Sequence, residues 1–211
     1  MRIVIPARRG SKGLPFKNRR LFDYTIDSIP EPLAEEVYVS SNDVVLEENC
    51  KKIGVNFVRR DEELSQDTTC VLDVMKDVVE RCEFKQDEVI AMLYLTYPDR
   101  KWEHVMDAYR FFVEHDANSL LCKKSLKVSP YLCMLEDGLG GKQLIPHDLY
   151  RRQDYPECFE ISHYICIFRV SELNKLNKNM YNSDTIFYGI DEVVDVDTLR
   201  DLQNFYDKDH R

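Results

Sequence analysis

Short apolar runs alternate with amphipathic stretches along most of the chain. The apolar runs predict buried strands over residues 2–6, 36–40, 55–58, 88–96 and 119–122. Apolar positions that recur on one helix face predict helices over 22–29, 44–53, from about 70 to 80, and 102–115, the third of them capped by Asp67, Thr68 or Thr69. Alternating strands and helices are typical of βαβ units, so the chain is predicted to form a doubly wound α/β fold with a mainly parallel sheet.

The pattern changes between residues 123 and 156. Proline and glycine interrupt short β-like pieces there, at Pro130, Gly138, Gly140, Gly141, Pro146 and Pro156. The signals of the main sheet then resume, with strands expected over 164–168, 185–188 and 192–194 and helices over 171–176 and from 198. We therefore expect a single domain over residues 1–211, with 123–156 inserted as a β arm that reaches a neighbouring subunit.

Composition and charge narrow the range of partners. Apolar residues make up 44% and charged residues 32% of the 211 residues, which is ordinary for a globular protein. A net charge of −9 argues against general binding to nucleic acid or to an anionic membrane. The first 20 residues nevertheless hold seven lysines and arginines and no acid. This local basic patch favours a small, strongly anionic ligand.

The cysteines and the apolar runs indicate a cytoplasmic protein. Seven scattered cysteines without a C-x-x-C pair fit reduced thiols better than a disulfide framework or a zinc site. The longest mostly apolar run, over 89–97, is too short to span a bilayer. Because Met1 leads directly into a predicted strand, we also expect no signal peptide.

The loop after the first predicted strand carries candidate chemistry. Loops at the carboxyl edge of an α/β sheet are where such folds bind ligands. This loop would use Arg8, Lys12 and Lys17 for positive charge, Ser11 for a hydroxyl donor, and Gly10 and Gly13 for converging backbone amides. It is not a Walker A loop, because Leu14 follows Gly13, and it lacks G-x-G-x-x-G. The loop predicts a triphosphate cradle; the alternative is an ordinary solvated loop.

Residues 7–18 read A-R-R-G-S-K-G-L-P-F-K-N and resemble the signature loop of the CMP-sugar synthetases. These cytidylyltransferases activate sialic acid, its pseudaminic and legionaminic relatives, and 3-deoxy-manno-octulosonate. Similar family segments follow in order as V-S-S-N at 39–42, R-D-E-E-L-S-Q-D-T at 60–68, R-R-Q-D-Y-P at 151–156 and I-D-E-V-V-D-V-D-T at 190–198. The resemblance spans essentially the whole chain.

The resemblance implies a nucleotide-diphospho-sugar transferase-like, Rossmann-like fold and transfer of CMP from CTP to a small acidic sugar, in a homodimer closed by the arm. Carried over position by position, it implies nucleotide contacts from Ala7, Arg8, Gly10, Ser11, Lys12, Lys17, Asn18, Arg60, Thr68 and Cys70. Arg8, Lys12 and Asp197 would act in catalysis. Arg60 has an alternative role in a surface salt bridge, and Cys70 stands where many members have serine.

Asp195 and Asp197 lie two residues apart at the end of a predicted strand, which would turn both carboxylates to one side. Like charges on one face favour a bound cation, and Mg²⁺ is the usual cation beside a triphosphate. The alternative is that Asp197 or Thr198 caps the last helix. The resemblance implies that the two aspartates hold Mg²⁺.

The positions that face the sugar differ from the family pattern. Tyr94 replaces a glutamine, and Ser162 and His163 replace an asparagine and a glycine. Arg152 is retained, and in the family this position helps to bind the sugar's carboxylate. His163 is interpreted either as a packed structural histidine or as a base on the acceptor hydroxyl. These differences leave three functions open: a cytidylyltransferase for a sialic-acid-like keto-sugar acid, a nucleotidyltransferase with another acceptor or base, and a silent nucleotide-binding homologue.

Overall fold

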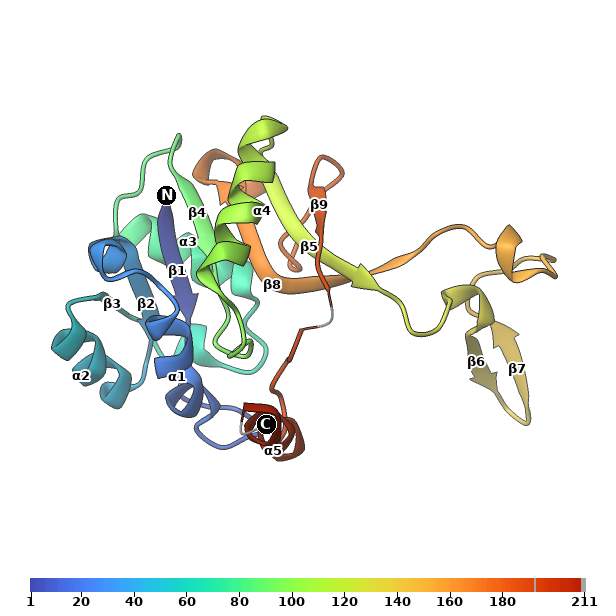
Figure 1. The fold of residues 1–211 in the computed structure, drawn as a ribbon, viewed down its shortest axis with the longest axis horizontal. Helices are drawn as coiled ribbons and strands as arrows, with labels where there is room; N and C mark the ends of the chain where they lie inside the picture. Colours follow the sequence, from blue (N-terminus) through green and yellow to red (C-terminus); the bar gives the residue numbers. More distant parts are fainter. Residues whose placement is uncertain (192, 210–211) are drawn as a thin grey trace.

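The apolar runs form the centre of a seven-stranded sheet in the computed structural model, which describes residues 1–191 and 193–209 (Figure 1). The strand order is β3-β2-β1-β4-β8-β5-β9. The strands are β1 (Arg2–Pro6), β2 (Val37–Ser41), β3 (Asn56–Arg59), β4 (Val89–Met92), β5 (Ser119–Ser125), β8 (Phe159–Arg169) and β9 (Ile186–Gly189). Only β8 runs antiparallel to its neighbours β4 and β5. The expectation of a doubly wound, mainly parallel α/β sheet is therefore confirmed.

Helices cover both faces of the sheet. The helices are α1 (Lys17–Asp27), α2 (Val44–Ile53), α3 (Val71–Arg81), α4 (Trp102–Glu114) and α5 (Leu199–Asp209). Apolar side chains of α1, α2, α4 and α5 join one core cluster, and those of α3 join a second cluster with the 3₁₀ helix Val170–Lys175. Central strands are buried on both faces, which explains their continuous apolar runs.

The start of α2 is fixed by a buried carboxylate. Asp43 caps the helix by accepting a hydrogen bond from the Val45 amide at 3.0 Å. Its two oxygens also pair with the Arg19 guanidinium on α1, at 2.6 and 2.8 Å. This contact joins α1 and α2 beside the carboxyl ends of β1 and β2.

Several predicted boundaries were wrong. The helix expected from residue 22 begins at Lys17, and residues 170–175 form a 3₁₀ helix in place of an α-helix. The predicted cap of α3 was also wrong, because Cys70 occupies the N-cap position without a side-chain cap bond. No strand forms at Val193 and Val194, and Glu192, the first residue of that predicted strand, lies outside the described residues.

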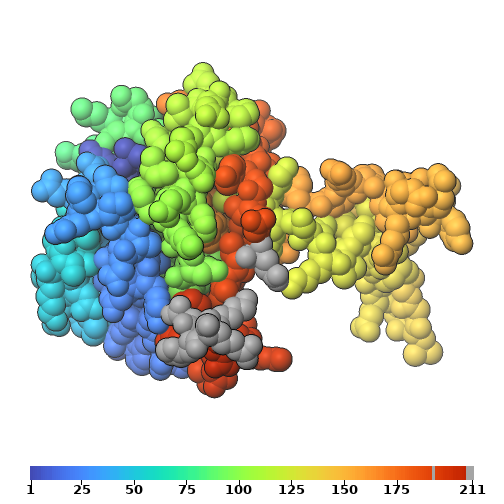
Figure 2. Space-filling model, viewed as in Figure 1, coloured from blue at the N-terminus to red at the C-terminus, as the bar shows by residue number. Residues whose placement is uncertain are grey.

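Residues 126–158 leave the sheet between β5 and β8 and project from the body of the molecule (Figures 1 and 2). The projection carries an antiparallel hairpin of β6 (Met134–Asp137) and β7 (Gly140–Gln143). Large apolar side chains on it are exposed, among them Val128, Leu132, Met134, Leu135, Leu139 and Leu144. The hairpin is thus paired with itself and is not part of the main sheet.

Candidate active site

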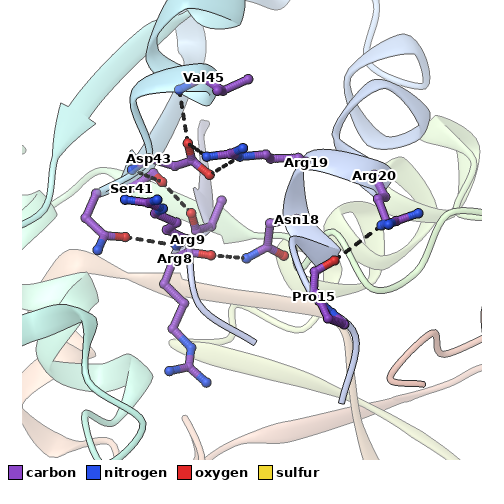
Figure 3. Close-up of polar contacts among 11 residues, drawn as sticks. Arg8, Arg9, Pro15, Asn18, Arg19, Arg20, Ser41, Asp43 and Val45 are labelled. Atoms are coloured by element: carbon purple, nitrogen blue, oxygen red, sulfur yellow. Dashed lines mark hydrogen bonds and ion pairs between the residues drawn. The ribbon is translucent and has the colours of Figure 1, made fainter. Parts of the chain in front are cut away.

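The basic loop is fixed where it leaves β1. The Ala7 amide donates to the Ser40 carbonyl at 2.8 Å, and the Ser41 hydroxyl donates to the Ala7 carbonyl. Asn18 on α1 donates through its side-chain amide to the Arg8 carbonyl at 2.8 Å. Figure 3 shows the Arg8 side chain extending away from this cluster of bonds. Ala7 is fully buried, so only its backbone helps to shape the loop.

Gly13 brings the loop against the segment that carries the two aspartates. A Cβ added to Gly13 would lie 2.4 Å from the Asp197 carbonyl oxygen, so any larger residue would force the two segments apart. Gly10 has no such neighbour within 4 Å. Both glycines were predicted to help bind an anion, and the close packing against Asp197 gives a further reason for glycine at position 13.

Three of the four cations of the loop already have carboxylate partners. Arg8 Nη1 lies 2.5 Å from Asp67 Oδ1, and Lys12 Nζ lies 2.9 Å from Asp67 Oδ2. Lys17 Nζ lies 2.6 Å from Asp197 Oδ1. The sequence analysis had not assigned Asp67 to the site, although its segment was among those that resemble the family.

A cleft of about 390 Å³ opens beside the loop at the carboxyl ends of β1 and β4. Ten of the predicted site residues line it: Arg8, Gly10, Ser11, Lys17, Asn18, Arg60, Tyr94, His163, Asp195 and Asp197. Thr96 and Tyr97 line it too and were not predicted, although their place directly after a central strand is where such folds bind ligands. Basic residues, acids and aromatic rings therefore meet in one cavity.

The other predicted residues lie outside the lining. Lys12, in the basic loop, and exposed Thr68 do not line the cleft, whereas Thr69, the neighbour of Thr68, does. Cys70 donates through its thiol to Asp73 at 3.0 Å, and Ser162 is buried beneath the cleft. Arg152 lies on the projecting segment, beside a different cavity. Within one chain the structure therefore does not bring Arg152 to the cleft.

Arg60 does not form the surface salt bridge considered as its alternative role. Its side chain is buried and donates to Ser40, from Nη2 to the carbonyl at 2.7 Å and from Nε to the hydroxyl at 3.1 Å. Burial lowers the pKa of Arg60 to about 10, so it remains a cation at neutral pH. A buried cation held by neutral groups at the wall of a cleft suits an anionic or polar ligand.

His163 and Tyr94 form an aromatic wall of the cleft. Their rings pack edge to face, with centroids 5.8 Å apart. His163 Nε2 lies 3.1 Å from the Asn179 carbonyl oxygen, which assigns the ring proton to Nε2. Burial lowers the pKa of His163, so the ring is neutral at physiological pH. This geometry agrees with a structural histidine and leaves Nδ1 as the nitrogen that can accept a proton.

Asp195 and Asp197 do not lie on a strand, as was predicted, but on an extended segment before α5. The Val196 amide donates to the Thr96 carbonyl at 2.8 Å, which anchors the segment to the end of β4. Burial in the cleft and the negative charge of Asp197 raise the pKa of Asp195, while hydrogen bonding from Tyr97 and Thr96 opposes the rise. Thr198 caps α5, as expected in the alternative interpretation, because its hydroxyl accepts from the Asp201 amide at 3.3 Å, while Asp201 accepts from the amides of Asp197 and Thr198.

Within residues 1–191 and 193–209, no three histidine, cysteine, aspartate or glutamate side chains lie close enough together to hold a metal ion. Likewise, none of the helices described above is both long and apolar enough to cross a membrane.

Comparisons with known proteins agree with the site. A family model described as Cytidylyltransferase matches residues 2–119. The N-acylneuraminate cytidylyltransferase of Streptococcus agalactiae serotype V is 28% identical over 94% of this chain and 51% of its own length. The CMP-N,N'-diacetyllegionaminic acid synthase of Legionella pneumophila is 27% identical over 92% of this chain and 90% of its own length. The chain thus spans about half the length of the first of these relatives.

Solved structures agree on the fold. A CMP:2-keto-3-deoxy-manno-octonic acid synthetase complexed with CTP superposes with a TM-score of 0.72, at 15% identity, over 99% of this chain and 98% of its own. A 4-diphosphocytidyl-2C-methyl-D-erythritol synthase from Anaerococcus prevotii superposes with a TM-score of 0.63, at 11% identity, over 99% and 97% of the two chains. With the matched family model and the cleft at the strand ends, these findings show that the chain belongs to the cytidylyltransferase family.

Proposed function

We propose that this protein transfers CMP from CTP to the anomeric hydroxyl of a sialic-acid-like keto-sugar acid and releases pyrophosphate. The observation that supports this most is the cleft itself, where the basic loop, buried Arg60 and the Asp195–Asp197 segment meet. Relatives named as synthases of CMP-activated acidic sugars support the choice of nucleotide and acceptor.

The proposed reaction is an in-line displacement at the α-phosphorus of CTP. The anomeric oxygen of the sugar forms a bond to phosphorus as the bond to the pyrophosphate oxygen breaks. Arg8, Lys12 and Lys17 would bind the phosphates and stabilise the charge that develops on the leaving group. Arg60 and Asn18 would orient the nucleotide from the wall of the cleft.

The residues of the cleft fit a magnesium ion. Asp195 and Asp197 offer carboxylate oxygens, which Mg²⁺ prefers. Burial and then the negative charge of Asp197 raise the pKa of Asp195, and a bound cation would relieve the repulsion between the two carboxylates. Magnesium commonly uses one or two carboxylates and takes its other ligands from phosphates and water. When bound, it would neutralise charge on the phosphates. In the structure Lys17 pairs with Asp197 and would have to release it.

Replacing Asp195 tests the metal assignment. We expect Asp195→Asn to abolish turnover and to weaken Mn²⁺ binding, followed by electron paramagnetic resonance in the presence of CTP, by about tenfold or more. Asp191→Asn removes the same charge from an exposed residue four positions earlier and should behave like the wild type. Unchanged Mn²⁺ binding by Asp195→Asn would show that Asp195 is not a ligand.

The acceptor half of the site is proposed to use Tyr94 and His163 as its wall, above buried Ser162. Arg152 lines a cavity on the projecting segment and not the cleft, so we propose that it serves the cleft of a second copy. Exposed apolar residues along residues 126–158 support a homodimer, because surfaces of this kind commonly mark protein contacts. Seven unpaired thiols support a cytoplasmic location.

Thermal unfolding in the presence of nucleotides tests the function. CTP, UTP, ATP and GTP should each be added with and without Mg²⁺, since a ligand at 100 times its dissociation constant adds about 2.7 kcal/mol. We expect the melting temperature to rise most with CTP and Mg²⁺. A preference for another nucleotide would favour a different nucleotidyltransferase, and no response to any of the four would contradict the proposal.

A further inference from the structure

One carboxylate, that of Asp67, pairs with two cations of the basic loop. Asp67 binds Arg8 through Oδ1 at 2.5 Å and Lys12 through Oδ2 at 2.9 Å. A carboxylate that bridges two cations in this way uses the same N–H groups that phosphate oxygens would use. Part of the positive charge that is proposed to bind a triphosphate is therefore already paired with a carboxylate of the protein itself.

Asp67 can leave this position easily. It lies on the connection between the 3₁₀ helix Glu63–Ser65 and α3, and its side chain is 37% exposed. Lys12 is 81% exposed. Hydrogen bonds from Lys12 and Arg8 lower the pKa of Asp67, so it is ionised at neutral pH. Exposed ion pairs of this kind are individually weak, and the Asp67 carboxylate can be hydrated once it is released.

A polyphosphate bound by Arg8 and Lys12 would compete with Asp67 for the same two cations. Both are anions, and both need the Arg8 guanidinium and the Lys12 ammonium at hydrogen-bond distance. A triphosphate carries more negative charge than a carboxylate, so it would displace Asp67 from Arg8 and Lys12. Its net affinity would be lower than it would be without Asp67, because the ion pairs with Asp67 must first be broken.

We propose that Asp67 is an internal competitor for polyphosphate, displaced when a triphosphate binds and paired again with Arg8 and Lys12 as pyrophosphate leaves. The inference rests on the proposed function for the identity of the ligand. It assigns Asp67 a positioning role: it holds the loop cations in place between turnovers, and it weakens the hold on the released pyrophosphate.

Titration with inorganic tripolyphosphate and pyrophosphate tests the proposal without the base or the sugar. Isothermal calorimetry should compare the wild type with Asp67→Asn, which keeps the shape of the side chain and loses its charge. We expect both ligands to bind about three- to tenfold more tightly to Asp67→Asn, and pyrophosphate to dissociate correspondingly more slowly.

Asp61→Asn is the matched control. Asp61 is also exposed and lies just before the 3₁₀ helix Glu63–Ser65, but its side chain pairs with Arg81 at 2.5 Å and not with the loop. The affinity of Asp61→Asn for tripolyphosphate should stay within about twofold of the wild-type value. This control separates competition at Arg8 and Lys12 from the general effect of removing one negative charge. Asp67→Ser should change affinity in the same direction as Asp67→Asn, and circular dichroism should show both variants folded.

The outcomes separate this inference from the proposed function. Equal or weaker tripolyphosphate binding by both Asp67 variants would overturn the competitor role and show that Asp67 only organises the loop. An equal gain in Asp61→Asn would overturn it too. The nucleotide preference of the wild type decides the proposed function independently. If neither the wild type nor the variants bind any polyphosphate, both the function and the inference are wrong.

Discussion

At the scale of single residues, the cations of the site differ in their partners. Arg8, Lys12 and Lys17 are exposed or partly exposed and paired with acids, whereas Arg60 is buried and bonded to Ser40. Retaining a buried cation without a carboxylate partner costs stability. This loss of stability is explained if the Arg60 guanidinium is needed to bind a ligand.

Replacing Arg60 should therefore separate stability from binding. In Arg60→Met, the lost bonds to Ser40 are offset by removal of a buried charge, so the free energy of unfolding should change by no more than about 1 kcal/mol. Nucleotide affinity should fall by about tenfold or more, measured by calorimetry. Arg59→Met, the exposed neighbour that pairs with Glu47, is the control and should leave affinity unchanged. Full affinity in Arg60→Met would remove Arg60 from the nucleotide site.

The lowered pKa of His163 predicts a pH dependence of stability. The unfolded histidine binds a proton near its ordinary value of 6.5, and the folded one only at lower pH. The contribution of the buried, neutral His163 to the free energy of unfolding is therefore complete above pH 6.5. It is lost as the pH falls below this value, because the unfolded chain then binds a proton that the folded protein does not. Between about pH 7.5 and 5.5, His163→Asn should lose less stability than the wild type in urea unfolding. Parallel losses in the two proteins would contradict the prediction.

At the scale of elements, the first two helices depend on one buried contact. Asp43 caps α2 and binds Arg19 on α1 with a side chain that is only 1% exposed. Burial by itself raises the pKa of this carboxyl, but the bonds from Arg19 and the Val45 amide outweigh burial and leave the pKa lowered. The contact fixes α1 and α2 next to the basic loop.

Asp43→Ala should be strongly destabilising, by about 3 kcal/mol in denaturant unfolding, because it removes the cap and leaves Arg19 without its partner. Asp43→Asn keeps a capping oxygen and should cost clearly less. Equal losses in the two variants would show that the charge contributes nothing beyond the cap.

The sequence was informative about elements whose apolar pattern is regular and less so about their connections. Residues 44–53 form a helix with the predicted bounds, since its apolar positions and its caps agree. The helix expected from residue 22 begins earlier because its first turn, from Lys17, is polar and lacks an apolar stripe. Asp195 and Asp197 were expected at the end of a strand, yet their segment is fixed by contacts to distant parts of the chain, such as the Val196 amide to Thr96 and Asp197 to Lys17, that no local pattern encodes. Asp67 was missed for a similar reason: its partners lie more than fifty positions away.

At the scale of the whole molecule, the body and the projecting segment differ in how they are covered. The body has two packed clusters on the faces of its sheet, and the hairpin β6–β7 has almost every side chain exposed (Figure 2). Leu139, at the hairpin turn, is fully exposed. Apolar residues held this far from the body are explained if a second copy covers them.

Charged residues on the hairpin should therefore separate the proposed dimer. Light scattering of the wild type should give twice the mass of one chain, and Leu135→Lys with Leu139→Lys should give one. Val113→Lys places a lysine at another exposed apolar position, on α4, and should not change the mass. A monomeric wild type would contradict the dimer.

The place of β8 in the sheet has a consequence for how the protein folds during synthesis. β4 lies at the centre of the sheet, but its neighbour on one side is β8, whose pairing joins Val89 to Arg169. Until residues 159–169 leave the ribosome, the apolar strand Val89–Met92 has an open edge next to the finished parallel half. Open apolar edges invite pairing with other chains. A nascent or truncated chain that stops before β8 is thus the species most exposed to aggregation, and the one most in need of a chaperone.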